Sequence, residues 1–183
     1  VFLIIFIETG VVFFPFLPGD SLLFASGFFA HNGGFNIVAL LAVAWTAAIL
    51  GDQCNFMIGH FFGRKIIVSG KVKAMTPERI KKSEDFLDKW GHLAIFLGRF
   101  FPFIRTFVPF IAGMGGMHWR NFVIYNVLGG ITWSTVFTLL GYFFGGIPFV
   151  QEHFELLIVG IVAVSIIPTV VGLVKAKLGK KNA

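Results

Sequence analysis

The sequence predicts an all-α polytopic membrane protein. We expect an inverted repeat of a re-entrant helical hairpin plus a transmembrane helix, with an additional C-terminal transmembrane helix. The first reason is composition, because the 183 residues are 56% hydrophobic and only 13% charged, outside the range of soluble globular proteins. The second is that two apolar stretches are interrupted by proline and glycine. The third is that three apolar runs are long enough to cross about 30 Å of hydrocarbon: residues 36–63, 119–145 and 153–174. We treat residues 1–183 as one membrane domain.

The first hairpin is predicted over residues 1–30. Its two apolar segments flank Pro15-Phe16-Leu17-Pro18-Gly19-Asp20, and proline interrupts a helix because it lacks an amide hydrogen and clashes with the preceding turn. Each segment alone covers only about half of the bilayer. Because the chain begins with Val1 rather than methionine, we expect residues upstream, and an N-terminal helix or a targeting segment can be among them.

The span at 36–63 leads into residues 64–92, predicted to be a cytoplasmic loop that contains an amphipathic surface helix. Basic residues outnumber acidic residues by four between positions 64 and 89, and such loops stay in the cytoplasm under the positive-inside rule. Thr76-Pro77-Glu78 is a good helix start, with a capping hydroxyl, a proline in the first turn and an acid near the positive helix end. The tail at 175–183 carries four lysines, which predicts a cytoplasmic C-terminus.

The second hairpin is predicted over residues 93–117. If this stretch crossed the membrane, three crossings would place the two basic regions on opposite sides, so it must enter and leave from the cytoplasmic face. The first hairpin would then dip from the external face, and the two would meet near mid-membrane, surrounded by protein or water. Prolines and glycines divide the second hairpin into pieces of about ten residues: Gly98, Pro102, Pro109, Gly113, Gly115 and Gly116.

Two motifs recur in the same order in both halves of the chain. Phe13-Phe14-Pro15-Phe16-Leu17 recurs as Phe100-Phe101-Pro102-Phe103-Ile104, and Gly59-His60-Phe61-Phe62-Gly63 recurs as Gly141-Tyr142-Phe143-Phe144-Gly145. Each half therefore consists of a hairpin followed by a span. A single crossing per half makes the repeats inverted, a layout typical of secondary transporters with a binding site at the midplane. The alternative is coincidence in a chain rich in phenylalanine and glycine.

Four ionisable residues lie within or beside the broken apolar stretches: Glu8, Asp20, Arg99 and Arg105. A charge at the bilayer centre costs about 2.5 to 3.5 kcal/mol on insertion scales, so we expect the four to face one another or a wet cavity between the halves. Arginine presents forked donors suited to phosphate oxygens, and helices that begin near Asp20 and Arg105 would aim their amide groups at the same place. The sequence thus predicts binding of a phosphate-bearing substrate. The alternative is that the arginines only neutralise the acids.

Glu8 and Asp20 are candidate proton-coupling groups, because the protonation of a buried carboxylate responds to nearby charge. Asp52 and Asn55 lie three residues apart in the first span and share one face of the helix, and Asn126 lies in the second span. These three are candidate cavity or relay residues. The alternatives are a structural ion partner for Asp52 and an interhelical hydrogen bond for Asn126.

Other chemistries lack their usual residues. A single cysteine, Cys54, excludes an intrachain disulfide, and the five histidines are too scattered for a metal site, so we expect neither a metal nor another cofactor. The basic residues lie beside apolar segments, which indicates membrane orientation rather than nucleic-acid binding. No P-loop or Gly-x-Ser-x-Gly elbow is present, so we expect no enzyme activity. An intramembrane lipid phosphatase is the best enzymatic alternative.

Four segments carry a family resemblance that runs along nearly the whole chain: Glu8-Thr9-Gly10, Pro15-Phe16-Leu17-Pro18-Gly19-Asp20-Ser21-Leu22-Leu23, Gly98-Arg99-Phe100 and Arg105-Thr106-Phe107-Val108-Pro109-Phe110-Ile111-Ala112-Gly113. They closely resemble the bacterial DedA family. The resemblance implies an inner-membrane protein with opposed re-entrant hairpins, related to the eukaryotic VTT-domain lipid scramblases, and it implies lipid translocation. Members of the family are linked to recycling of undecaprenyl phosphate with dependence on the proton-motive force, and others to phosphatidylethanolamine. The family's functional acids fall on Glu8 and Asp20, and its functional arginines fall on Arg99 and Arg105.

We therefore predict a flippase that moves undecaprenyl phosphate or a related phospholipid between leaflets of the bacterial inner membrane, coupled to the proton-motive force. Arg99 and Arg105 would hold the phosphate, while Glu8 and Asp20 exchange protons. The partners would be the membrane lipid and protons, and a homo-oligomer remains open. The alternative is a proton-coupled ion antiporter, although a cation path prefers acids without fixed positive neighbours.

Overall fold

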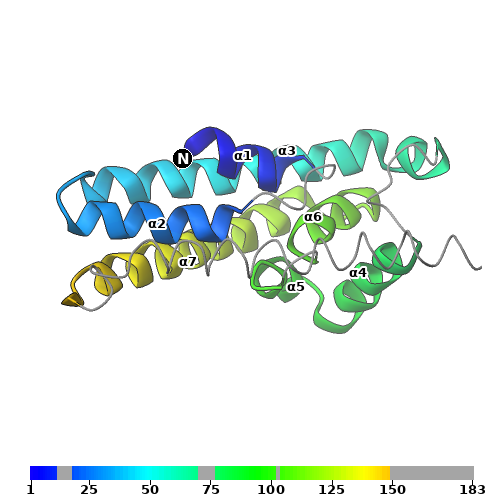
Figure 1. The fold of residues 1–183 in the computed structure, drawn as a ribbon. Helices are drawn as coiled ribbons and strands as arrows, with labels where there is room; N and C mark the ends of the chain where they lie inside the picture. Colours follow the sequence, from blue (N-terminus) through cyan, green and yellow to red (C-terminus); the bar gives the residue numbers. More distant parts are fainter. Residues whose placement is uncertain (12–17, 70–76, 102–103, 149–183) are drawn as a thin grey trace, which may run out of the picture.

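The computed structural model describes residues 1–11, 18–69, 77–101 and 104–148 (Figure 1). Within these residues every regular element is a helix. Two helical segments, Ile37–Gly63 and Trp119–Gly145, are long and apolar enough to cross a membrane, and they coincide with the spans that the sequence predicts in the two halves. The predicted C-terminal helix at 153–174 and the basic tail at 175–183 lie outside the described residues.

The described part of the chain contains seven helices: α1 (Phe2–Gly10), α2 (Gly19–His31), α3 (Ile37–Ser69), α4 (Pro77–Trp90), α5 (Leu93–Gly98), α6 (Ile104–Met114) and α7 (Trp119–Gly145). The interruptions between α1 and α2 and between α5 and α6 fall at the proline-containing positions that the sequence predicts. Helix α4 begins at Pro77, as its start motif predicts. At the head of α3, Asn36 Oδ1 accepts the amide hydrogens of Val38 and Ala39 at 2.9 and 3.1 Å, which caps the helix.

Three local features differ from the sequence predictions. Helix α3 continues to Ser69, six residues into the predicted loop at 64–92, because residues 64–69 contain neither proline nor glycine. Helix α5 has six residues rather than about ten. Pro109, the sixth of the eleven residues of α6, lies inside the helix instead of ending a helical piece, where it removes one backbone hydrogen bond.

The turns from α2 to α3 and from α6 to α7 are alike. Gly33 and Gly116 have φ angles of 80° and 75°, in the left-handed region that glycine adopts without strain. The residue after each glycine donates its amide hydrogen to the carbonyl five residues earlier, at 2.9 Å after Gly33 and 3.0 Å after Gly116. The same turn therefore sends the chain into each of the two long helices.

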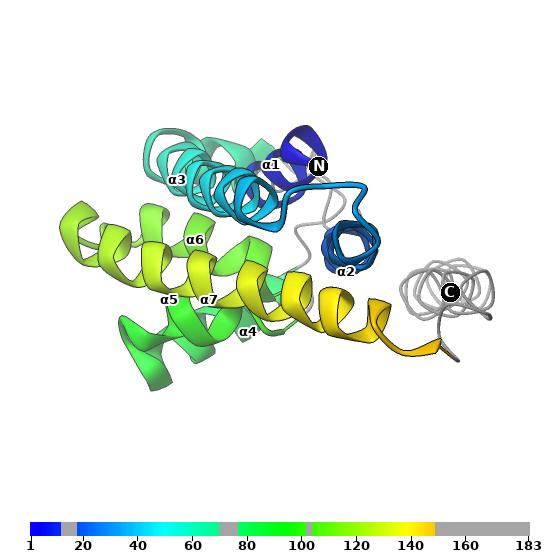
Figure 2. The same cartoon turned by 90° about the vertical axis from the view of Figure 1, so that its left-hand side faces the viewer.

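Glycines allow α2 to pack against α7, and α6 against α3, with backbones in contact. Figure 2 shows α2 nearly end-on beside α7, which crosses it at an angle. Helices α2 and α6 are the second arms of the two predicted hairpins, and α1 and α5 are the first arms. Each second arm lies on the long helix of the other half of the chain. Four glycines are so close to a neighbouring carbonyl that a Cβ would overlap it: Gly27 with Thr138, Gly141 with Phe24, Gly59 with Phe110 and Gly113 with Phe56.

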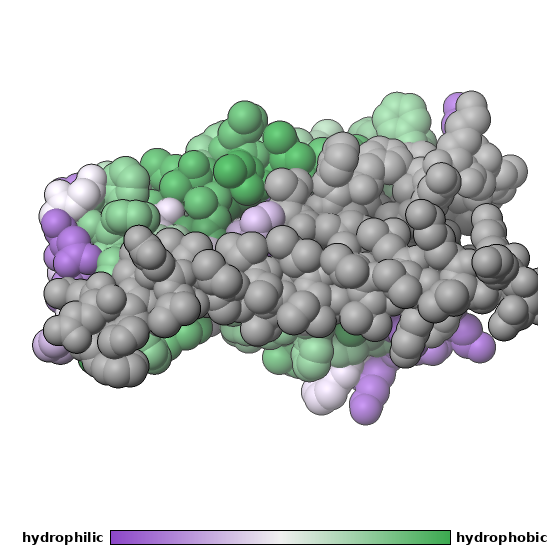
Figure 3. All heavy atoms as spheres, in the orientation of Figure 1, coloured by the Kyte–Doolittle hydropathy of each residue, from purple (hydrophilic) through white to green (hydrophobic). Residues whose placement is uncertain are grey.

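The first arms pack on the long helices of their own halves, α1 on α3 and α5 on α7. Helix α4 covers α6 through Ile80 and Leu87. On the coloured part of the face seen in Figure 3, apolar residues lie between hydrophilic residues that gather toward the ends. Large apolar side chains are exposed on both long helices, among them Val38, Leu50, Ile124 and Leu128, as expected for a surface in contact with lipid.

Candidate functional site

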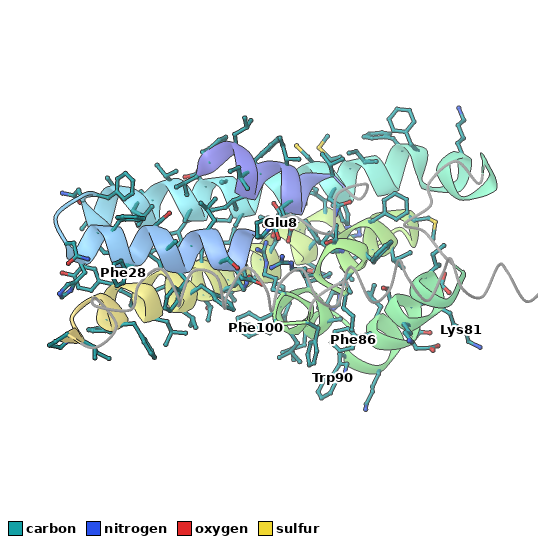
Figure 4. All side chains as sticks on the ribbon, viewed as in Figure 1. Glu8, Phe28, Lys81, Phe86, Trp90 and Phe100 are labelled. Carbon is teal, nitrogen blue, oxygen red and sulfur yellow. The ribbon has the colours of Figure 1, made fainter. Side chains whose placement is uncertain are left out.

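The helix ends on either side of the two interruptions lie close together inside the structure. Glu8 lies in the last turn of α1, and Asp20 lies in the first turn of α2. Arg99 directly follows α5, and Arg105 lies in the first turn of α6. Figure 4 labels Glu8 at the place where α1 approaches the start of α2 and α6. The structure thus brings the four charged residues singled out from the sequence into one region, where they form two separate centres.

The Arg105 centre consists of Glu8, Asp20, Arg105 and Trp133. Arg105 donates one hydrogen bond from Nη1 to Asp20 Oδ1 at 2.8 Å and another from Nη2 to Glu8 Oε1. Trp133 donates from Nε1 to the same Asp20 oxygen at 3.0 Å. Arg105 Cζ also lies 5.3 Å from the centre of the Trp133 ring, within the range of a cation–π interaction. The pairing of both acids with one arginine agrees with the expectation that opposite charges face one another.

Burial differs sharply within the Arg105 centre. The side chain of Glu8 is fully buried, that of Arg105 is 11% exposed, and that of Asp20 is 36% exposed. A buried ion pair is stabilising only when its geometry and additional hydrogen bonds offset the loss of hydration. Arg105 meets this condition with two carboxylates. Asp20 is therefore the most exposed charged group of this centre.

The Arg99 centre consists of Asp52, Arg99 and Asn126. Arg99 Nη2 donates to Asp52 Oδ2 at 2.5 Å, to Asn126 Oδ1 at 2.5 Å, and to the carbonyl of Ala48 at 3.4 Å. Asn126 Nδ2 in turn donates to the carbonyl of Ile49 at 3.1 Å, an interhelical bond of the kind expected for this residue. Asp52, rather than Glu8 or Asp20, is therefore the ion partner of Arg99.

Two glycines provide the space that these charged side chains occupy. A Cβ on Gly19 would overlap the carboxylate of Glu8, and a Cβ on Gly129 would lie 2.9 Å from Cδ of Arg99. That second distance is shorter than real Cβ contacts, so Arg99 would have to move. Glycine at positions 19 and 129 thus leaves room for the side chains of Glu8 and Arg99.

Asn55 fastens the two broken segments to α3. Its side chain is fully buried, and Nδ2 donates to the carbonyls of Thr9 and Thr106 at 3.1 and 2.7 Å. Thr9 belongs to α1 and Thr106 to α6, so one amide group connects both ends. Asn55, one of the three candidate cavity or relay residues, thus holds α1 and α6 against α3.

A small cavity separates the two centres. Its volume is about 10 Å³, close to the minimum for one water molecule. Arg99 Nε has no hydrogen-bond partner among the described residues, and the Arg99 residue borders this space. The cavity is lined by Thr9, Asp52, Arg99, Arg105 and Trp133.

Formal charge divides unequally between the centres. The Arg105 centre holds two carboxylates and one guanidinium, and the Arg99 centre holds one of each. The first is therefore negative by one charge when all groups are ionised, and the second is neutral. Within the described residues, no group of three or more His, Cys, Asp or Glu side chains has the arrangement of a metal site.

Sequence reasoning did not single out Trp133 or the paired glycines at 129 and 130. A tryptophan usually lies near the end of a membrane span, at the level of the lipid head groups, whereas Trp133 lies in the middle of α7. A buried indole also needs an acceptor for its N–H group. Its position in the span was thus a usable signal that a polar partner lies nearby.

Comparison with known proteins finds relatives that match most or all of the chain. A model of the VTT domain matches residues 17–143. The chain is 46% identical over 184 residues to protein DedA of Escherichia coli, covering 100% of this chain and 84% of that protein. It is 34% identical over 152 residues to the inner membrane protein YghB of the same organism, covering 83% of this chain and 69% of YghB. No solved structure matches. The domain match and these identities establish that the chain belongs to the DedA family of VTT-domain membrane proteins.

Proposed function

We propose that this protein is a lipid transporter, without enzyme activity, in the bacterial inner membrane. It moves undecaprenyl phosphate or a related phospholipid between the two leaflets, in exchange for or together with protons. The observation that carries the proposal is Arg105, a fixed positive charge that two carboxylates share where interrupted helices meet. Ionisable residues inside a membrane are costly and commonly mark substrate or ion pathways and proton relays.

The proposed topology has two re-entrant hairpins, at 1–30 and 93–117, that enter from opposite faces of the membrane as parts of an inverted repeat. The repeated turns at Gly33 and Gly116 support it. So does the packing, since Gly27 and Gly113 occupy matching places on α2 and α6, each against the long helix of the other half. A coincidental sequence repeat would not explain why α2 and α6 make the same kind of glycine contact with α7 and α3. Basic residues on α4 are then cytoplasmic, as is the C-terminus.

The phosphate head group binds at the Arg105 centre. Arg105 lies in the first turn of α6, where the positive end of the helix dipole adds to its charge, and a guanidinium can hold two phosphate oxygens at once. Arg99 is more deeply buried and already bonded to Asp52 and Asn126. It contributes a second positive charge behind the small cavity, while the lipid tail remains in the bilayer.

Charge balance supplies the reason for proton coupling. With all groups ionised, the two centres together hold three carboxylates and two guanidinium groups. A phosphate adds at least one more negative charge to a buried site, which is strongly unfavourable without compensation. Proton uptake by Glu8 or Asp20 removes that excess. It also offsets the ~2.3 kcal/mol per charge per 100 mV needed to move an anionic head inward against the membrane potential.

Reconstituted vesicles test the proposal. The purified protein is placed in liposomes that contain fluorescent undecaprenyl phosphate, and the labelled lipid reachable from outside is followed with and without a pH gradient. Exchange between leaflets that responds to the gradient supports the transporter. Release of inorganic phosphate would identify a phosphatase instead, and pH-coupled ion flux without lipid exchange would identify an antiporter.

A pair of variants separates the site from general damage. Arg105→Ala should abolish exchange, whereas Arg120→Ala, at an exposed arginine at the start of α7, should retain it. Both proteins must be recovered in the membrane fraction at comparable levels. Unchanged exchange by Arg105→Ala would overturn the role assigned to this arginine.

A further inference from the structure

One carboxylate oxygen in the Arg105 centre receives two hydrogen bonds from fixed donors. Asp20 Oδ1 accepts from Arg105 Nη1 at 2.8 Å and from Trp133 Nε1 at 3.0 Å. Two converging N–H groups, one of them charged, form the usual recognition pattern for an anionic oxygen. A phosphate oxygen has the same acceptor chemistry and the same need for such donors.

The two donors are held in place more firmly than the acceptor. Trp133 is 1% exposed and packs in the apolar cluster with Ile5, Leu23 and Ala47. Arg105 is held from its other side by Glu8. Asp20 lies at the start of α2, and its side chain is 36% exposed. Asp20 is therefore the member of this set that can leave while the donors stay.

We propose that Trp133 is a direct ligand of the substrate phosphate, and that the Asp20 carboxylate occupies the position of a phosphate oxygen until the substrate displaces it. This inference rests on the proposed function and names a binding residue for it. The indole nitrogen can only donate, so it favours an anion and gives nothing to a cation. Once displaced, Asp20 loses both donors, and its carboxylate then faces the surroundings.

The first test compares two tryptophan variants. Trp133→Phe keeps an aromatic ring beside Arg105 but removes the N–H donor, and it should weaken binding of farnesyl phosphate to the full chain in detergent by about tenfold. Trp45→Phe is the matched control, because the Trp45 indole also joins α3 to α7, by donating to Thr135 Oγ1 at 2.8 Å, but lies outside the site. Equal affinities of wild type and Trp133→Phe would overturn the inference.

The second test uses the displaced group. Asp20→Ala removes the competitor, so it should bind farnesyl phosphate more tightly than wild type even if it transports more slowly. Weaker binding by Asp20→Ala would contradict the proposed displacement. Farnesol serves as the uncharged probe, and it should bind no better to any variant.

A third measurement is made on the wild-type protein and uses a variant only to assign one signal. The chain has four tryptophans, and the indole N–H resonance that disappears in Trp133→Phe identifies residue 133 in an amide NMR spectrum. Farnesyl phosphate should shift that resonance, while farnesol should not. If wild type fails to prefer farnesyl phosphate over farnesol, the proposed function fails together with this inference. If wild type shows that preference but the residue 133 signal does not move, only the inference fails.

Discussion

Arg105 donates a hydrogen bond to Glu8 across 97 positions of the sequence. The contact joins the second arm of one broken apolar segment to the first arm of the other, and each arm is too short to cross a membrane. Arg99, only six residues before Arg105, pairs instead with Asp52 on α3. The two arginines thus have different surroundings, because Arg105 also pairs with the part-exposed Asp20, whereas both members of the Arg99–Asp52 pair are buried.

Arg105→Lys should lower lipid exchange by about tenfold or more, because a lysine cannot hold two acceptors in a bidentate arrangement. The positive charge is kept, so the protein should still fold and insert. Exchange in proteoliposomes is the measurement, with Arg120→Lys as control. A fully active Arg105→Lys protein would show that charge alone is sufficient.

Asp52→Asn should lower the free energy of unfolding by about 3 to 5 kcal/mol, because Arg99 would remain buried without a counter-charge. The thermal midpoint in detergent reports this loss. Adding Arg99→Gln should restore part of the stability, since the double variant has no unpaired charge. Additive losses in the double variant would mean that the pair does not act as a unit.

Gly129→Ala should destabilise the protein by about 1 to 3 kcal/mol, because the new methyl group would press on the Arg99 side chain. Gly98→Ala is a suitable comparison, as its added Cβ would have no neighbour closer than 3.4 Å. Thermal unfolding of both variants, measured side by side, checks the difference. Equal midpoints would indicate that Arg99 can relax without loss.

Phosphate binding should strengthen as the pH falls from about 8 to 6. The bound state holds more protons than the free state if an added anion is offset by protonation of a carboxylate, so binding takes up protons and acid favours it. Phosphatidylglycerol is the appropriate probe, since its phosphodiester does not titrate in this range. The slope should become smaller in Glu8→Gln, and an unchanged slope would exclude Glu8 as the group that takes up the proton.

The sequence was sufficient to predict the two long helices, the interruptions in the apolar stretches, and that Glu8 and Asp20 would meet arginine from the other half of the chain. Hydrophobic length, proline position and the cost of an unpaired charge in lipid are all local or pairwise arguments. The pairing of Arg99 with Asp52 was not predictable in this way, because it depends on the rotation of α3 and on the space left by Gly129. Trp133 was not predicted as a site residue, because an indole in an apolar span has no apparent partner until the fold places Asp20 beside it.

The glycine contacts between α2 and α7 and between α3 and α6 also bear on how the molecule can move. Each of these glycines admits a neighbouring carbonyl into a space that a Cβ would fill, so sliding one helix along its neighbour would press a side chain against that carbonyl. The register within each pair of helices is therefore fixed. A movement that exposes a bound head group has to keep α2 with α7 and α6 with α3, as two units that tilt relative to each other.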